Sequence, residues 1–292
     1  MILGGWDAAA VAVKAIVYAA TLSTAGAVFF LAYSHALVPA ADRMRIARSI
    51  RISSTVALLA SGAQILVSAG SMSGDAADMM SPPLLHMAWA AGMGRTLLVR
   101  AAGLGLANVG MSSQRRPAGV AIAGAAIAAT SFAWMGHTHS LTRSCLPILL
   151  LGVHLSAVAF WIGALAPLLV VSRTRDLSVM AAAAARFGTA ALYVVSALLA
   201  AGLGLLWLLL GDVSQLWRSS YGRWLASKLV VVAALLCCAA LNKLWLTPRL
   251  AAGKTEALHS LRRSIRIEMT LAALIFVLTA ALTTLNGPPA LD

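Results

Sequence analysis

The sequence contains few charged residues for its length, and very few acidic ones. Only 11% of the 292 residues are charged, nine of them are Asp or Glu, and 61% of the chain is hydrophobic. Hydrophobic segments long enough to cross a bilayer recur along nearly the whole chain. A soluble domain could not bury so much apolar surface, so the composition predicts a membrane protein and excludes an ordinary soluble domain.

Cysteine and nucleotide-binding motifs are also scarce or missing. The three cysteines, Cys145, Cys237 and Cys238, form no CxxC pair and indicate no disulfide framework. No Walker motif is present, so we expect no direct use of ATP. The first ten residues lack a basic segment, and the first hydrophobic block is too long for a signal peptide, so we expect no cleaved leader.

The hydrophobic blocks predict eight transmembrane helices, and the expected fold class is an all-α polytopic membrane bundle. The predicted spans cover residues 10–38, 49–70, 94–111, 117–136, 145–171, 188–210, 221–246 and 264–285. The third is the shortest, and residues 84–93 before it either extend it or lie at the interface. Because the number of spans is even, both termini are expected on the same side of the membrane.

Basic residues are concentrated on one side of the predicted bundle. That side carries Arg43, Arg45, Arg48, Arg51, Arg115, Arg116, Arg173, Arg175, Arg186, Lys243, Arg249, Lys254, Arg262, Arg263 and Arg266, whereas the opposite side carries Asp7, Asp75, Asp78, Asp212 and Asp292. The alternation follows the positive-inside rule, which places the basic loops in the cytoplasm and both termini outside. The net charge of +13 is explained by these loops, so we expect no nucleic-acid partner.

A short pattern of polar residues occurs twice. The copies comprise Gly94, Arg95, Arg100 and Asn108 in the third span, and Gly222, Arg223, Lys228 and Asn242 in the seventh. A unit of four spans preserves orientation, so the pattern predicts two parallel four-helix repeats, residues 1–140 and 141–292. Chance similarity of short motifs is the alternative, and the asparagine match is weak because its spacing differs.

The second cation of each copy lies inside a predicted span. Arg100 and Lys228 would be costly if they faced lipid, so they either extend towards the outer head groups or line a polar interior. The second alternative predicts an intramembrane polar set between the halves. Its members are Arg95, Arg100, Arg223, Lys228 and Asn242.

Histidine and methionine gather in the segments predicted to face outward. Four of the six histidines and six of the eleven methionines lie in or beside them. Thioether and imidazole ligands favour Cu(I), and imidazole also suits Cu(II) and zinc. The hypothesis is therefore a copper site built from His137, His154, His139, His86 and Met135. Alternatively, His154 only bonds a neighbouring helix and the methionines anchor a loop in the head-group region.

Several motifs of the C-terminal half occur in a recognisable order. They are Gly136-His137, His154-Leu155, Trp161-Ile162-Gly163-Ala164-Leu165, Arg186-Phe187, Asp212, Tyr221-Gly222-Arg223, Lys228, Ala240-Leu241-Asn242-Lys243, Pro248-Arg249-Leu250, Leu261-Arg262-Arg263-Ser264 and Glu268. In this order they resemble the copper resistance protein D family. The resemblance is clear over residues 130–287, and in the N-terminal half it extends only to topology.

The resemblance implies a multi-pass protein of the bacterial inner (plasma) membrane that handles copper. Family members are commonly described as moving copper across that membrane with a periplasmic copper-binding partner, which we expect here to be a separate chain. His139 and the methionine-rich loop have no counterpart in the family pattern and rest on ligand chemistry alone.

Three functions compete. The leading hypothesis is a non-enzymatic copper transporter that binds copper at the periplasmic side. The second is a haem- or copper-dependent redox protein that reduces copper or a quinone. Haem usually needs two histidines on facing spans at similar depth, and here His154 alone lies well inside a span, which disfavours haem. The third is a copper sensor or assembly factor that transports nothing.

Overall fold

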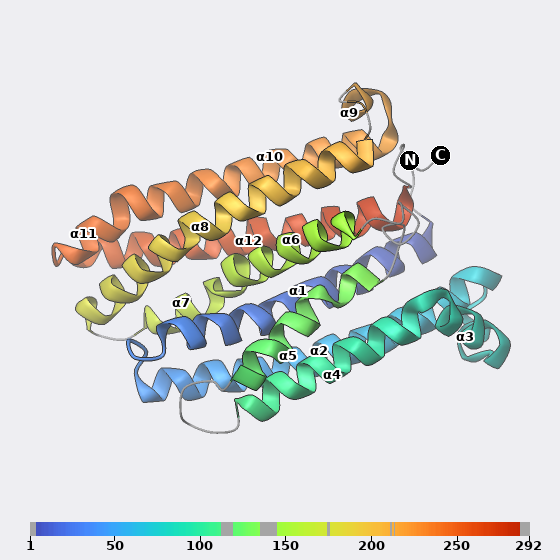
Figure 1. The fold of residues 1–292 in the computed structure, drawn as a ribbon, viewed down its shortest axis with the longest axis horizontal. Helices are drawn as coiled ribbons and strands as arrows, with labels where there is room; N and C mark the ends of the chain where they lie inside the picture. Colours follow the sequence, from blue (N-terminus) through green and yellow to red (C-terminus); the bar gives the residue numbers. More distant parts are fainter. Residues whose placement is uncertain are drawn as a thin grey trace.

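The computed structural model is a bundle of long, roughly antiparallel helices (Figure 1). It describes residues 4–111, 119–134, 145–173, 176–210, 212 and 214–286. The regular structure of these residues is entirely helical. The predicted all-α polytopic bundle is therefore confirmed.

Four long helices belong to the N-terminal half and six helices to the C-terminal half. The first set is α1 (Gly5–Ser34), α2 (Ala40–Ser73), α4 (Gly94–Gly110) and α5 (Gly119–Thr130). The second set is α6 (Leu146–Gly163), α7 (Leu165–Val171), α8 (Leu177–Leu210), α10 (Ser220–Leu241), α11 (Thr247–Ala251) and α12 (Thr255–Leu285). Short segments complete the chain: η1 (Ala76–Met80), α3 (Pro82–Ala88), η2 (Trp89–Met93), η3 (Ser131–Trp134), α9 (Gln215–Arg218) and η5 (Asn242–Leu246).

Six helical stretches of the described chain are long and apolar enough to cross a membrane. They are α1, α2, the α6–α7 pair, α8, the α10–α11 stretch and α12. The other two predicted spans correspond to α4, with 17 residues, and to the short apolar helix over Gly119–Ala133. At 1.5 Å per residue α4 is about 26 Å long, slightly less than the hydrocarbon core of a bilayer. The count of eight therefore depends on this pair and stays a prediction.

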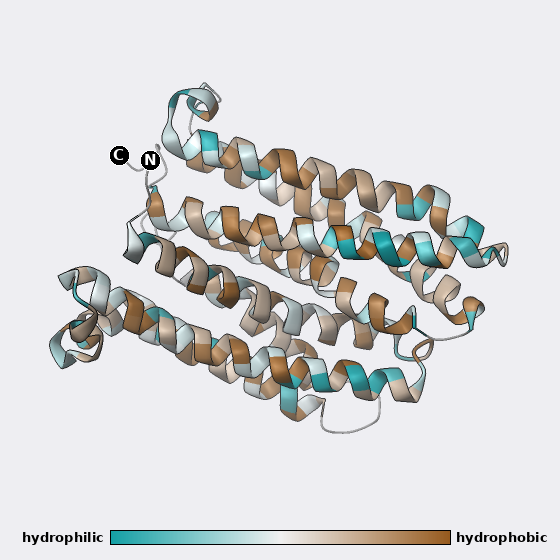
Figure 2. Ribbon diagram, turned by 180° about the vertical axis from the view of Figure 1, so that it is seen from behind, coloured by the Kyte–Doolittle hydropathy of each residue, from teal (hydrophilic) through white to brown (hydrophobic). Residues whose placement is uncertain are grey.

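Three helices begin earlier than the hydropathy predicts. α2 begins at Ala40 instead of residue 49, α8 at Leu177 instead of 188, and α12 at Thr255 instead of 264. Hydropathy detects only the part of a helix that lies in apolar surroundings, whereas backbone hydrogen bonding continues into the polar turns beyond it. Figure 2 shows these hydrophilic turns at one end of the bundle. The opposite end holds α3, α9, the start of α1 and the end of α12 (Figure 1).

Helix α1 is the centre of the packing, with α2, α5, α6 and α12 arranged against it. Its crossing with α6 is unusually close. A side-chain carbon added at Gly26 would lie 1.9 Å from the carbonyl oxygen of Ala159, and one added at Gly163 would lie 2.6 Å from Cα of Gly26. Small residues at such crossings let two backbones approach, which is how helices associate when both are surrounded by lipid.

The helix pairs follow the same order in both halves. α1 packs on α2 and α4 on α5, just as α6 packs on α8 and α10 on α12. The glycine of each Gly-Arg pair also has the same packing role. Because it has no side chain, the segment that precedes its helix can pack directly against it. Gly94 is covered by the Trp89 side chain, and Gly222 by the backbone of Gln215 and Leu216. The division into two repeats remains a prediction that this pairing supports.

Candidate functional site

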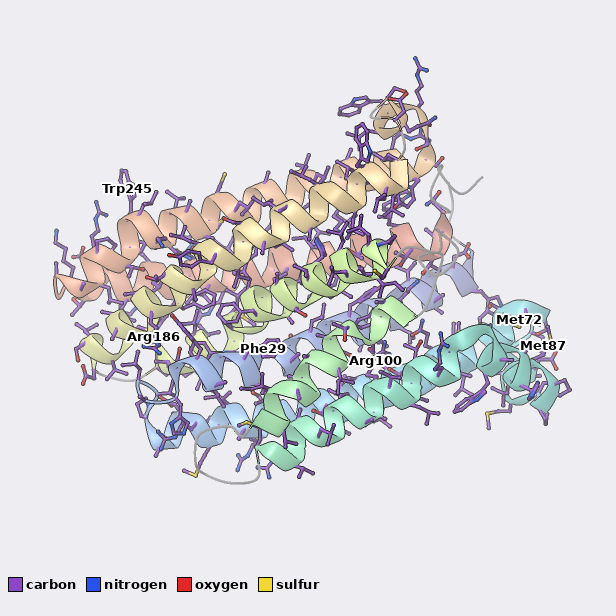
Figure 3. All side chains as sticks on the ribbon, viewed as in Figure 1. Phe29, Met72, Met87, Arg100, Arg186 and Trp245 are labelled. Carbon is purple, nitrogen blue, oxygen red and sulfur yellow. The ribbon has the colours of Figure 1, made fainter. Side chains whose placement is uncertain are left out.

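Arg100 is buried inside the N-terminal half. It lies on α4, is 2% exposed and has its side-chain partners on α2 and η3; Figure 3 labels its position. Nε donates to Oγ of Ser131 at 3.2 Å, and Nη1 donates to Oγ of Ser61 at 2.7 Å. The guanidinium also lies over the Phe132 ring, 4.3 Å from its centroid, which is a favourable cation–π position. Arg100 thus faces its own half rather than the second half or lipid.

Asn108 adds a second polar contact between α4 and α2, further along the same helix as Arg100. Its Nδ2 donates to Oγ of Ser54 at 2.9 Å and to the carbonyl of Leu104 at 2.8 Å. A hydrogen bond also links α1 to α2 at this level, since the hydroxyls of Thr24 and Ser53 lie 2.7 Å apart. Hydroxyl and amide groups inside a membrane contribute about 1 kcal/mol each when they join helices, so the contacts of Arg100 and Asn108 fix α4 against α2.

His154 lies inside the C-terminal half, on α6. His154 lies eight residues after the start of α6, about 12 Å along the helix. It is half-buried and interacts with the Leu198 backbone and the charge of Lys228. The imidazole packs where α8 has Gly202, with Nδ1 3.5 Å from the position of a Cβ at that glycine. This nitrogen has no hydrogen-bond partner among the described residues.

A second polar cluster surrounds Glu268 on α12. The carboxyl is 2% exposed, and Oε1 accepts a hydrogen bond from Nδ2 of Asn242. Asn242 begins the π-helical turn η5, where the helix widens, and the Thr247 hydroxyl donates to its carbonyl oxygen at 2.9 Å. Lys243, in the same turn, donates to the carbonyl of Gly188 at 2.7 Å and so ties this turn to α8.

A cavity of about 240 Å³ opens beside this cluster. Glu268, Asn242 and Lys243 are among its polar lining residues, and apolar side chains of α6, α7, α8, α10 and α12 form most of the remaining lining. α8 packs on α6 and α11, and α10 packs on α12, whereas α8 and α10 barely contact one another among the described residues. The C-terminal half therefore contains space next to a buried carboxyl.

The end of the bundle that holds α3, the start of α1 and the end of α12 exposes methionine sulfur, and it is the end predicted to face outward. Met72, Met80 and Met87 are 46%, 70% and 56% exposed, and His86 is exposed on α3. Figure 3 shows Met72 and Met87 at the same end of the molecule. We call Met72, Met80, His86 and Met87 the outer methionine surface. These are soft ligands of the type that Cu(I) prefers.

The remaining predicted site residues are dispersed or lie outside the described chain. Arg95 and Arg223 are exposed at the start of their helices, and Arg223 donates to Oγ of Ser220 at 3.1 Å. Met135, His137 and His139 lie outside the described residues, between η3 and α6. No three His, Cys, Asp or Glu side chains gather in the parts of the chain described here. The predicted copper site therefore remains a prediction.

Sequence reasoning missed several polar partners. Lys14 of α1 donates to the carbonyl of Thr283 at 3.0 Å and joins the first helix to the last. Ser61 and Ser131 were not singled out, because isolated serines in apolar spans give no pattern. The structure also assigns Glu268 a partner that its motif did not reveal, since Asn242 lies 26 positions earlier in the sequence.

Two aspartates outside the spans cap local turns. Ser214 donates hydroxyl and backbone hydrogen bonds to Asp212 in the outer loop, and these bonds lower the pKa of Asp212. Ser178 does the same for Asp176 before α8, and the hydroxyl bond of 2.6 Å is the largest cause of the lowered pKa. Both aspartates are thus local structural groups.

Comparison with protein families identifies the family of the chain. The model described as "Copper resistance protein D-like, N-terminal domain" matches residues 5–142, and the one described as "Copper resistance protein D" matches residues 181–282. The chain belongs to the copper resistance protein D family. The resemblance inferred from the motifs is confirmed, and it now includes the N-terminal half. Comparisons with curated proteins and with solved structures gave no match.

The candidate site residues are distributed over the two family matches and the segment between them. The N-terminal match includes His86, Arg100 and His137, and the C-terminal match includes Lys228 and the Asn242–Glu268 pair. His154 lies between the two matches, on α6. Family membership therefore supports a copper resistance protein in a membrane, while each proposed ligand has to be argued from its own surroundings.

Proposed function

We propose that this chain is an inner-membrane copper transporter that takes up copper at its periplasmic end and passes it inward. The observation that carries the proposal is membership of the copper resistance protein D family, given by two matches that together span most of the chain. Six apolar helices of spanning length support a site inside the bilayer. The basic ends of α2 and α12 support an orientation with the termini in the periplasm.

Capture would occur at the outer methionine surface. Its exposed thioethers and the imidazole of His86 can exchange Cu(I) with a carrier without forming a closed cage. A separate periplasmic copper-binding protein is the expected donor. Met135, His137 and His139 follow η3 in the sequence and would accept copper from this surface before it reaches α6.

His154 would be the first ligand inside the membrane. It lies on the helix that follows the 135–144 segment, and its Nδ1 is buried without a partner among the described residues. A neutral imidazole nitrogen in that state is a suitable metal ligand. The nearby Lys228 charge opposes a bound cation, so copper at His154 would be held weakly enough to move on. The cavity beside Asn242 and Glu268 would provide the inward part of the path.

Copper binding by purified variants tests the proposal. We expect about one copper bound per chain, with affinity reduced at least tenfold in His154→Ala and in His137→Ala. His259→Ala is the matched control, since His259 is exposed on the basic part of α12 and should bind copper like the unmodified protein. Lys228→Met should tighten binding because it removes a positive charge near the ligand. Unchanged affinity in both His137→Ala and His154→Ala would make these histidines structural and contradict the proposed route.

A further inference from the structure

The charge of Arg100 has no acidic partner in the described chain. A guanidinium stays protonated in proteins, and an unpaired charge is costly inside a membrane. The ion pair found among the described residues joins Arg45 to Asp42 at 2.8 Å, and none involves Arg100. The other group within charge range is Tyr18, whose phenol is ordinarily neutral at pH 7. The positive charge of Arg100 is therefore uncompensated by these residues.

The two serine hydroxyls beside Arg100 act towards the guanidinium only as hydrogen-bond acceptors, because each uses its own proton elsewhere. Ser61 Oγ donates its proton to the carbonyl of Ala57 at 2.7 Å, and Ser131 Oγ donates to that of Ala128 at 2.7 Å. They therefore supply lone pairs to the guanidinium but carry no negative charge. Nη2 of Arg100 is buried and has no hydrogen-bond partner in the part of the chain described.

A small cavity adjoins the guanidinium. It has a volume of about 10 Å³ and is lined by Arg100, Ser61, Gln64, Thr96 and Met93, together with two apolar residues. This is about the space that one water-sized particle needs. Met93 ends η2 just before α4, and Arg100 lies six residues after Gly94, about 9 Å along the helix. The cavity is thus near the outer end of the bundle.

We propose that this cavity binds one small monoatomic anion of the halide class, chloride in the cell, held by Arg100 and the amide group of Gln64. The unpartnered guanidinium nitrogen supplies charge and a donor, and the volume of about 10 Å³ suits one small ion rather than a larger anion such as sulfate. Such an ion would neutralise Arg100 inside the membrane and hold α2 and α4 together. The site is independent of copper binding.

Chloride dependence of stability tests this assignment on the full-length purified protein. At equal ionic strength, chloride and bromide should raise the thermal unfolding midpoint by about 2–4 °C relative to gluconate. Radiolabelled chloride should be retained at about one ion per chain. Sulfate stabilises proteins by exclusion from their surface, so it should act equally on all variants.

Three variants separate the site from general salt effects. Arg100→Gln should lose both the chloride shift and the retained chloride, whereas Arg95→Gln, an exposed arginine on the same helix, should keep both. Gln64→Glu should place a carboxylate in the cavity, so the protein should stay folded but become independent of chloride. Equal midpoints in chloride and gluconate with no retained ion in the unmodified protein would overturn the proposal. An unchanged chloride shift in Gln64→Glu would also overturn it.

Discussion

The two halves of the bundle use the same order of helix pairs but are packed differently. In the N-terminal half the α4–α5 contact is dense, because a Cβ at Gly103 would lie 2.6 Å from the backbone of Ala128. The apolar window of α1 is 72% buried, against 6% for that of the α10–α11 stretch. The C-terminal half instead holds a cavity of about 240 Å³ beside Glu268.

The difference in packing density indicates which half can change its conformation more easily. Closely packed interiors resist deformation, and a half built on glycine crossings has few alternative arrangements. A half with an internal space and a loosely packed helix pair can accommodate a passing ion or a shift of α8 against α10. The contrast in packing therefore predicts that any movement of the helices occurs in the C-terminal half rather than in the N-terminal half.

The largest expected effect lies at the contact between the halves. Gly26→Leu should destabilise the protein by about 3 kcal/mol or more, because the new side chain meets the backbone of Ala159 and neither helix can move without disturbing the core. Yield of monodisperse protein and its thermal unfolding measure this effect. Gly105→Leu is the control, since nothing lies within 4 Å of a Cβ there. Similar yields for both variants would show that the crossing is not tight.

The buried Glu268 cluster should be next in magnitude. Asn242→Leu removes the donor to a carboxyl that is 2% exposed, so we expect a loss of about 1–3 kcal/mol. Replacing both groups, as in Asn242→Leu with Glu268→Leu, should restore much of the stability because no polar group is then left unpaired. A double-mutant cycle of unfolding measures the coupling. Additive losses would mean that the two side chains do not depend on each other.

The two halves should respond differently to added volume. Ala128→Leu inserts a larger side chain into the α4–α5 contact, where Ala128 is fully buried, and should cost about 1–3 kcal/mol. Ala191→Leu fills part of the cavity and should change stability by less than about 1 kcal/mol. If the cavity is part of the copper path, the second variant should nevertheless slow copper movement. Equal destabilisation of the two variants would contradict the contrast in packing.

The smallest expected effect concerns pH. Because hydrogen bonds from Ser178 lower the pKa of Asp176 in the folded protein, the ionised carboxylate stabilises the start of α8 above the unfolded pKa of about 4. That contribution is lost as the pH falls through the lower, folded pKa. Asp176→Asn should therefore reduce the loss of stability in acid, measured as the unfolding midpoint between about pH 5 and pH 3. An acid response identical to that of the unmodified protein would refute this role.

Much of the fold was predictable from the sequence. Apolar length predicted the helices, because a segment that crosses the bilayer must be apolar over its whole length. The orientation inferred from the alternating arginines stays a prediction. The starts of α2, α8 and α12 were predicted too late, since hydropathy does not detect amphipathic turns outside the apolar region. Residues 84–93 were expected either to extend the third span or to lie at the interface, and the structure divides them between the separate helix α3 and the turn η2. The π turn at Asn242 was not predicted, because it depends on tertiary packing.

The candidate site was less predictable. The Gly-Arg pattern singled out Arg100 and Lys228 as an intramembrane polar set between the halves, but the structure places Arg100 within its own half. Its partners are single serines on distant parts of the chain, which no local spacing reveals. The Asn242–Glu268 pair depends in the same way on the packing of α10 against α12.

Copper movement into proteoliposomes tests the central claim most directly. The purified protein, reconstituted with a copper-sensitive dye inside the vesicles, should admit Cu(I) faster than protein-free vesicles. His154→Ala should lower the initial rate at least tenfold, and His259→Ala should leave it unchanged. A rate equal to that of protein-free vesicles, or one that His154→Ala does not change, would contradict a copper path through α6.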